Sequence, residues 1–162
     1  MLSLLHIENI AVIECSDISF NKGFNVLTGE TGAGKSIVID AISAIMGERA
    51  YRDMIRTGTN KASVRAVFTQ VPELSWFQEN GVEYDPETVI QRDIFLDGKN
   101  VCRVNGSLVS VSILHKLGIQ LINIHGQHDS ASLFDEENHL RFLDAFADNE
   151  ALRMDYQGKY IA

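Results

Sequence analysis

Cysteine and proline are both scarce in this sequence of 162 residues, which contains two of each. Cys15 and Cys102 stand far apart and outside any C-x-x-C pair. This excludes the disulfide framework of a small secreted protein and indicates a reducing cytoplasm. The low proline content also argues against a linker-like disordered chain. A chain of this length buries about 70% of its unfolded surface, so we expect a single globular domain that needs no structural metal.

Long apolar runs and an excess of basic residues are also missing. No window approaches 18 consecutive apolar residues, which excludes a membrane helix, and we expect no membrane partner. The apolar N-terminus has no basic n-region and contains Glu8, so it does not predict a signal peptide. The 14 basic and 22 acidic residues give a net charge of -8. A freestanding nucleic-acid binder that works through bulk charge is therefore disfavoured, and DNA contact would need a local patch or a partner.

Apolar patterning predicts mostly strands in the first two thirds of the chain. Strands are expected over residues 2–7, 11–20, 24–27 and 63–70, where apolar positions alternate or run together. Asp97-Gly98 and Asn105-Gly106 are typical of two-residue hairpin turns, in which both central residues take positive φ. They predict an antiparallel meander of residues 89–96, 99–104 and 107–114, and residues 121–124 predict one more strand.

Helices are predicted in three places. Residues 36–46 are apolar on nearly every side, and Gly47 follows where a C′ glycine ends a helix, so this helix should be buried. A short polar helix or loop is expected after Pro72, and residues 136–147 are amphipathic. Residues 148–162 are polar and helix-prone without a closing apolar repeat. This ending predicts an incomplete part of a longer protein.

The most informative segment reads GETGAGKS, directly after the strand predicted at residues 24–27 and directly before the helix. It satisfies the pattern G-x-x-x-x-G-K-[ST] of a phosphate-binding loop. The predicted nucleotide-binding residues are Gly29, Glu30, Thr31, Gly32, Ala33, Gly34, Lys35 and Ser36. The glycines let backbone N–H groups surround phosphate oxygens, Lys35 reaches the β- and γ-phosphates, and the Ser36 hydroxyl binds Mg²⁺. This motif alone does not choose among kinases, GTPases, helicases and transporter-type ATPases.

A resemblance narrows that choice. The stretches IENIAVIE, FNVLTGETGAGKSIVIDAI, GKNVCRVNGSLVS and INIHGQHDS resemble the N-terminal part of bacterial DNA-repair ATPases of the SMC and ABC family. The resemblance covers essentially the whole chain. It implies an α/β fold, namely the N-terminal lobe of a P-loop ATPase head with an antiparallel β meander subdomain. It also implies ATP and Mg²⁺ as cofactors and a bacterial, nucleoid-associated role in recombinational repair of double-strand breaks.

The same resemblance implies that the chain contains parts of two domains of a longer protein. Residues 1–147 correspond to the N-terminal part of the ATP-binding head, and residues 148–162 to the start of a helical arm. The family's Q-loop glutamine falls on Gln127, which would contact Mg²⁺ and the attacking water. The implied partners are the C-terminal half of the same head, a second protomer that joins it in an ATP-dependent head dimer, and DNA.

Two motifs of this family are missing from the chain. The Walker B strand should end in Asp-Glu after four apolar residues, and only SLFDE, with Asp135 and Glu136, comes near it. Its polar approach is more typical of a helix N-terminus, so we interpret it as a look-alike. The LSGG signature is absent as well. We therefore expect ATP binding with little or no hydrolysis from this chain alone.

Four alternatives stay open at this point. The chain could be a self-contained P-loop kinase or small NTPase, or a nucleotide-binding clamp without catalysis. His125, His128, Asp129 and His139 also allow a transition-metal site, although no cysteine or H-E-x-x-H motif supports it. Finally, a basic stretch with no aromatic residues interleaved could contact DNA, or simply form a solvated connection. It contains Arg49, Arg52, Arg56, Lys61 and Arg65.

Overall fold

The computed structural model describes residues 1–28, 34–124, 139–140, 143–144, 146–147 and 149–160. The chain forms two compact units, Met1–Asn123 and Ile124–Ala162. In the second unit, α6 (Glu150–Tyr160) is a helix whose described side chains are exposed, and the rings of Tyr156 and Tyr160 stack with their centres 6.2 Å apart. None of the helices in the described ranges is long and apolar enough to cross a membrane.

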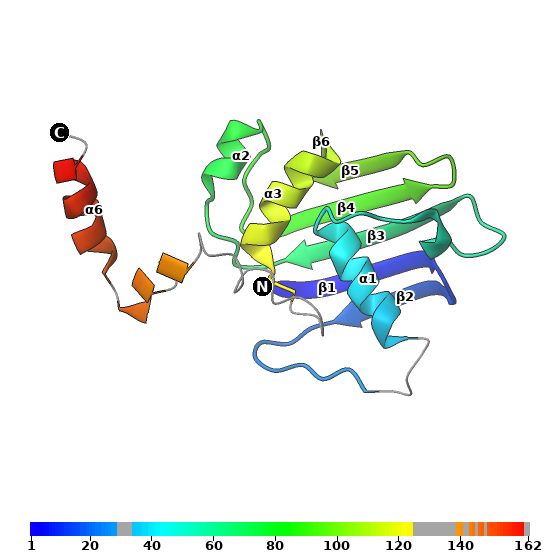
Figure 1. Cartoon of the computed structure of the whole chain (residues 1–162). Coiled ribbons are helices and arrows are strands. Elements are labelled where there is room, and N and C mark those ends of the chain that lie inside the picture. Colours follow the sequence, from blue (N-terminus) through cyan, green and yellow to red (C-terminus); the bar gives the residue numbers. More distant parts are fainter. Residues whose placement is uncertain (29–33, 125–138, 141–142, 145, 148, 161–162) are drawn as a thin grey trace. The chain divides into compact units, whose positions relative to one another are not determined.

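The first unit is built on one six-stranded antiparallel sheet, with the spatial order β2-β1-β3-β4-β5-β6 (Figure 1). Its strands are β1 (Leu2–Ile10), β2 (Ile13–Ser19), β3 (Lys61–Phe68), β4 (Thr88–Phe95), β5 (Asn100–Val104) and β6 (Ser107–Val109). Its helices are α1 (Lys35–Ile45), α2 (Ser75–Glu79) and α3 (Val111–Leu121), with a 3₁₀ turn, η1, at Arg52–Met54. Strands β4 to β6 form the predicted meander, and α1 lies in the crossover from β2 to β3.

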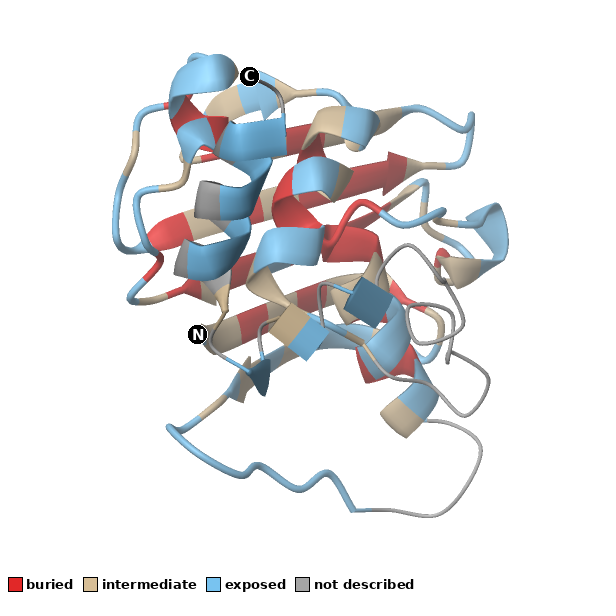
Figure 2. Cartoon of the chain, turned by 60° about the vertical axis from the view of Figure 1, so that its left-hand side comes forward, coloured by how far each residue is buried: buried red, intermediate tan, exposed pale blue. Residues whose placement is uncertain are grey.

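The core lies between one face of the sheet and the helices α1 and α3 (Figures 1 and 2). Along β3, Val64, Ala66 and Phe68 are buried on this face, whereas Arg65 is exposed on the other, as the sequence alternation predicts. Helix α1 ends at Ile45, and Gly47 follows with φ +85°, which confirms the predicted C′ glycine. The buried side of α1 consists of Ile37, Val38, Ala41, Ala44 and Ile45.

The two predicted hairpin turns differ in detail. Asn105 and Gly106 have φ of +47° and +81°, as a two-residue turn with both central residues in the left-handed region requires. In the other turn only Gly98 has positive φ, +90°, because the loop is longer and the Asp97 side chain accepts a hydrogen bond from the N–H of Lys99 at 2.9 Å. Asp-Gly therefore predicted the place of that turn but not its geometry.

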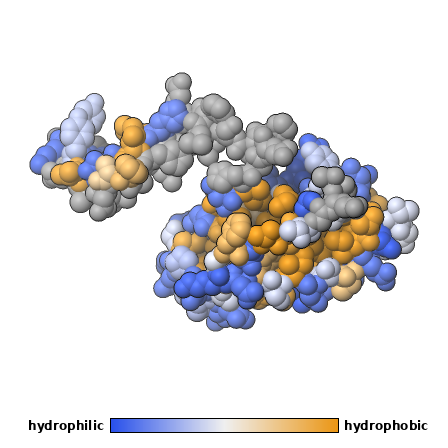
Figure 3. Space-filling view, turned by 90° about the horizontal axis from the view of Figure 1, so that it is seen from below, coloured by the Kyte–Doolittle hydropathy of each residue, from blue (hydrophilic) through white to orange (hydrophobic). Residues whose placement is uncertain are grey.

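The strand predicted at residues 24–27 is wrong, because this segment has no strand partner in the described part of the chain. Its Phe24, Val26 and Leu27 are exposed, Phe24 by 94%. A strand needs hydrogen-bonded neighbours and burial, and neither is supplied here. Figure 3 shows that hydrophobic side chains gather on the face of the molecule seen from below. The segment is therefore an apolar connection that leads from β2 toward the phosphate-loop motif.

The prediction that strands continue over residues 107–114 and 121–124 is also wrong beyond Val109. The Ser110 side chain accepts a hydrogen bond from the N–H of Ile113 at 3.2 Å and caps the N-terminal end of α3. Leu114, Leu117 and Gly118 then form the buried side of α3 with helical spacing. Leu121 ends this helix, and residues 122–124 are not in a strand. The Ser110 cap favours a helix over a strand here, because buried β-branched and apolar residues are compatible with both.

Helices α1 and α3 approach closely at two glycines. A Cβ atom on Gly118 would lie 2.4 Å from the carbonyl oxygen of Met46, and one on Gly47 would lie 2.5 Å from the backbone nitrogen of His115. These distances are too short for any side chain. The C-terminal end of α1 therefore contacts α3 backbone to backbone.

This contact predicts that Gly118→Ala destabilises the chain although alanine favours helices. Overpacking should lower the free energy of unfolding by about 1–3 kcal/mol. Urea denaturation followed by circular dichroism measures it. Ile119→Ala, at the neighbouring exposed position of α3, should change the value by only about 0.5 kcal/mol. Equal stability of Gly118→Ala and the unaltered chain would contradict the close approach.

Candidate nucleotide-binding site

The described part of the phosphate-loop motif begins helix α1. Gly34 is the N-cap residue, and Lys35 and Ser36 form the start of the first turn, with Lys35 half-buried and Ser36 exposed. The first helical hydrogen bond runs from the N–H of Val38 to the carbonyl of Gly34 at 3.2 Å. The earlier N–H groups of the turn thus have no acceptor within the helix, and no side chain among the described residues caps it. This end of α1 is suited to an anion.

A cavity of about 300 Å³ opens beside this end of the helix. Strand β2, residues 27–28 and the first turns of α1 form its walls. It is lined by Ile13, Ser16, Ile18, Leu27, Thr28, Gly34, Lys35 and Val38. Its volume is at the lower limit of small-molecule sites, which combine an apolar lining with a few polar groups, as this one does. The motif and the cavity therefore lie together at one end of α1.

Several residues singled out in the sequence lie outside the described residues. They are residues 29–33 of the motif, Gln127, the loop residues His125, His128 and Asp129, and the look-alike pair Asp135 and Glu136. Their roles stay predictions. His139 is described and exposed. Within the described ranges no group of three or more His, Cys, Asp or Glu side chains is placed to hold a metal ion.

Sequence reasoning missed the residue that binds the opposite end of α1. Arg92 of β4 is 2% exposed on the core face of the sheet. Its Nη1 donates to the carbonyl oxygens of Ala44 at 2.7 Å and Glu48 at 2.6 Å, and its Nε donates to Asn100 Oδ1 at 3.0 Å. Burial lowers the pKa of this guanidinium from its ordinary value. The available signal was a single arginine at a core position of an alternating strand, between Ile90 and Ile94.

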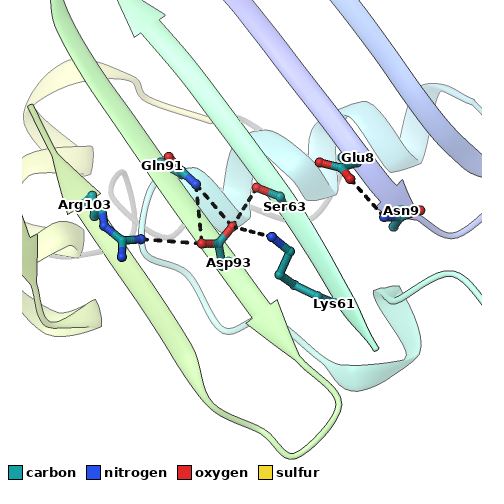
Figure 4. A network of polar contacts seen from close by, with 7 residues as sticks. All are labelled: Glu8, Asn9, Lys61, Ser63, Gln91, Asp93 and Arg103. Atoms are coloured by element: carbon teal, nitrogen blue, oxygen red, sulfur yellow. Dashed lines mark hydrogen bonds and ion pairs between the residues drawn. The ribbon is translucent and has the colours of Figure 1, made fainter. Parts of the chain in front are cut away.

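The basic stretch does not form one surface. Lys61 lies 3.7 Å from Asp93, which also accepts a hydrogen bond from Ser63 and lies 3.5 Å from Arg103, on the outer face of the sheet (Figure 4). Arg56 instead donates to the carbonyl oxygen of Val12 at 2.8 Å. These two cations therefore have local structural partners.

The other part of the stretch combines charge with an aromatic ring. The Arg49 guanidinium lies 5.2 Å from the ring centre of Tyr51, so the expectation that no aromatic residue accompanies these charges is wrong. Arg52 donates to the carbonyl oxygen of Asp97 at 3.4 Å. Two cavities of about 520 and 280 Å³ flank this segment, and both are lined by Arg49, Tyr51 and Asp53.

Comparison with known proteins agrees with this geometry. A family model described as an AAA domain matches residues 4–148. The chain belongs to the AAA domain family. DNA repair protein RecN of Bacillus subtilis is 47% identical to this AAA domain over 154 residues, and RecN of Vibrio cholerae is 40% identical over 150 residues. The matches cover 93% and 91% of the chain but only 27% of each relative, so the chain spans about a quarter of their length.

Solved structures show the same fold. One comes from work on ATP-driven dimerization and DNA-stimulated activation of SMC ATPases, with a TM-score of 0.65 at 23% identity over 88% of this chain and 95% of that one. The SMC head domain from Thermotoga maritima matches with a TM-score of 0.56 at 27% identity, over 72% of this chain and 41% of that one. The predicted fold class, the N-terminal lobe of an SMC-type α/β ATPase head, is confirmed.

The two cysteines of this AAA domain should differ sharply in reactivity. Cys15 is exposed on β2, whereas Cys102 is buried on β5 opposite Arg92, and burial raises the pKa of its thiol. Because the thiolate is the reactive form, Ellman's reagent should modify Cys15 quickly and Cys102 only after unfolding. Cys15→Ser should remove the fast reaction, and Cys102→Ser should leave it intact. Two equally fast thiols in the folded chain would contradict this assignment.

Proposed function

We propose that this chain is the N-terminal, ATP-binding part of an SMC-like ATPase head that acts in recombinational repair of DNA double-strand breaks. The observation that carries the proposal is the GKS end of the GETGAGKS motif at the N-terminal end of α1, which no described side chain caps and which lies beside a cavity. The RecN relatives, which their name assigns to DNA repair, support the biological context.

The residues at this end of α1 fit a nucleotide phosphate with Mg²⁺. The first-turn N–H groups point along the helix axis toward an anion, and no acidic residue in that turn opposes it. Lys35 supplies positive charge to the β- and γ-phosphates, and the exposed Ser36 hydroxyl is a ligand suited to Mg²⁺. Mg²⁺ neutralises phosphate charge when bound. Residues 29–33 complete the cradle, and Gln127 orients water and contacts the metal in this proposal.

The division of the protein follows from the same proposal. Residues 1–147 belong to the head, and residues 148–162, which include the exposed helix α6, begin the helical arm. The remainder of the protein supplies the C-terminal half of the head, with its catalytic carboxylates and signature loop. The exposed apolar segment at residues 24–27 supports this, because a strand there would need neighbours from outside the chain. A second protomer then closes on bound ATP.

Calorimetry with Mg²⁺-ATP tests the proposal on this chain directly. We expect binding by the unaltered chain and at least about tenfold weaker binding by Lys35→Ala, because an ionic contact to phosphate is lost. Lys99→Ala, which removes an exposed lysine from the β4–β5 turn, should bind normally. Phosphate release by the unaltered chain should not exceed the background rate measured with Lys35→Ala. Absence of binding by the unaltered chain would contradict the proposal.

The alternatives give different results in the same samples. Brisk phosphate release that is lost in Lys35→Ala would favour a self-contained NTPase and would point to Asp135 and Glu136 as catalytic acids. Phosphate release that begins only after the C-terminal portion is added favours the incomplete head. Nucleotide binding without release even in that mixture would favour a non-catalytic clamp.

DNA is the proposed macromolecular partner of the full-length protein, at the bacterial nucleoid in the cytoplasm. The segment around Arg49, Tyr51 and Arg52 is the best candidate contact in this chain, because its charges border open cavities. Arg56 and Lys61 are less suitable, since neither of them lines these cavities.

Charge reversal in the full-length protein tests this contact. Arg49→Glu with Arg52→Glu should weaken DNA binding, and the slope of log affinity against log salt should become shallower by about 2 if two phosphate contacts are lost. Arg65→Glu, an exposed change on the outer face of the sheet, serves as the matched control. Unchanged salt dependence in the double variant would exclude this segment as the DNA contact.

A further inference from the structure

The two ends of helix α1 have opposite surroundings. Its N-terminal end carries Gly34, Lys35 and Ser36 beside an open cavity. Its C-terminal end is enclosed by β4 and α3. Eleven residues make α1 about 16 Å long. Because a helix of this length is stiff, any shift or tilt at the enclosed end displaces the other end.

Arg92 holds the enclosed end from the sheet. One nitrogen of its guanidinium binds the carbonyl oxygens of Ala44, in the last turn, and Glu48, just beyond the helix. Asn100 of the neighbouring strand β5 accepts a further hydrogen bond from Nε and so orients the guanidinium plane. Helix α1 has no basic residue in its own last turn. Arg92 therefore supplies the positive charge that the C-terminal end of the helix dipole favours.

Helix α3 closes the same end from the other side. The glycine contacts of Gly47 with His115 and of Gly118 with Met46 leave no space for α1 to move toward α3. Buried side chains of α1 such as Val38 and Ala41 contact the core but form no directional bonds. Among the described contacts, the hydrogen bonds of Arg92 are those that join this end of α1 to the sheet.

We propose that Arg92 is a positioning residue for the phosphate site, which it does not touch. By binding the C-terminal end of α1, it sets the direction of the first-turn N–H groups and the places of Lys35 and Ser36. The inference rests on the proposed function, because it concerns the same nucleotide. Misplacement of a binding group by 1 Å is enough to weaken its interactions substantially.

The chemistry requires a guanidinium at this place. Arginine offers several N–H donors in a rigid fork and can serve two carbonyl oxygens and the Asn100 amide at once. A lysine keeps the charge and can donate to the carbonyl oxygens, but it has no second nitrogen in place of Nε to donate to Asn100. A methionine keeps the length but leaves the carbonyl oxygens without a donor. Arginine, lysine and methionine at position 92 therefore form a series with decreasing capacity to donate hydrogen bonds.

The experiment measures phosphate binding in Arg92→Lys, Arg92→Met and Asn100→Ala with two probes, Mg²⁺-ATP and Mg²⁺-tripolyphosphate. Calorimetry is done at a temperature where circular dichroism shows each variant to be fully folded. Arg103→Met, on strand β5 and the outer face of the sheet, is the matched control. Asn100→Ala keeps the Arg92 side chain but removes the acceptor of its Nε. This variant therefore still tests the inference if Arg92→Met fails to fold.

We expect the affinity of folded Arg92→Met for both probes to fall by the same factor, about tenfold. Arg92→Lys should restore part of it, Asn100→Ala should lose less, and Arg103→Met should bind as the unaltered chain does. An equal loss with both probes places the defect at the phosphates. Amide exchange should also become faster in the first turns of α1 than in strands β3 and β4.

Two results would overturn the inference. In one, the folded Arg92 and Asn100 variants melt at lower temperature yet bind both probes normally, which would make Arg92 structural only. In the other, Arg103→Met loses as much affinity as Arg92→Met. Failure of the proposed function is separate, because the unaltered chain would then bind neither probe and Lys35→Ala would change nothing.

Discussion

Helix α1 is bound to the sheet through the carbonyl groups of its C-terminal end, and the candidate site depends on that attachment. The cation of Arg92 is almost completely removed from water and has no carboxylate directly bonded to it among the described contacts. Such a charge is tolerated only where polar groups replace water. Carbonyl oxygens at a helix end provide this, and the amide of Asn100 completes it. The opposite end of the helix then remains available for an anion.

The exposed apolar segment before the phosphate loop has the same origin. Phe24, Val26 and Leu27 have the apolar pattern of a strand, yet they are exposed and pair with neither edge of the described sheet. The sheet is antiparallel throughout and ends at β2 and β6. At residues 24–27, before the candidate site, the local sequence therefore predicts a strand that the tertiary environment does not support.

Electrostatics in this acidic chain is also organised locally. Asp93 lies close to Lys61, Ser63 and Arg103 on the outer face of the sheet, so its carboxylate offsets part of the charge of these two cations (Figure 4). Arg49 and Arg52 lie away from that network, on the loop that follows α1. The sequence alone does not distinguish the five cations of the basic stretch at residues 49–65. The structure distinguishes them by the groups that each cation contacts.

The sequence by itself determined the elements whose local pattern and neighbours agree. Alternation in β3, the C′ glycine at Gly47 and the Asn105-Gly106 turn were predictable, because each depends on a backbone preference of a few adjacent residues. The GETGAGKS motif likewise predicted an anion site at the start of a helix, since it combines glycine freedom with helix geometry.

Only the tertiary structure decided the rest. Residues 24–27 are not in a strand because hydrogen-bonded neighbours are required, and residues 111–121 are helical because Ser110 caps them and the core accepts Leu114 and Leu117. The partner of Arg92 could not be read along the chain, since Ala44 and Glu48 lie 48 and 44 residues away. Hydrogen bonds between distant segments form only when the folded chain packs those segments together. A turn, a cap glycine or a phosphate loop depends on a few consecutive residues, so the sequence alone predicts it.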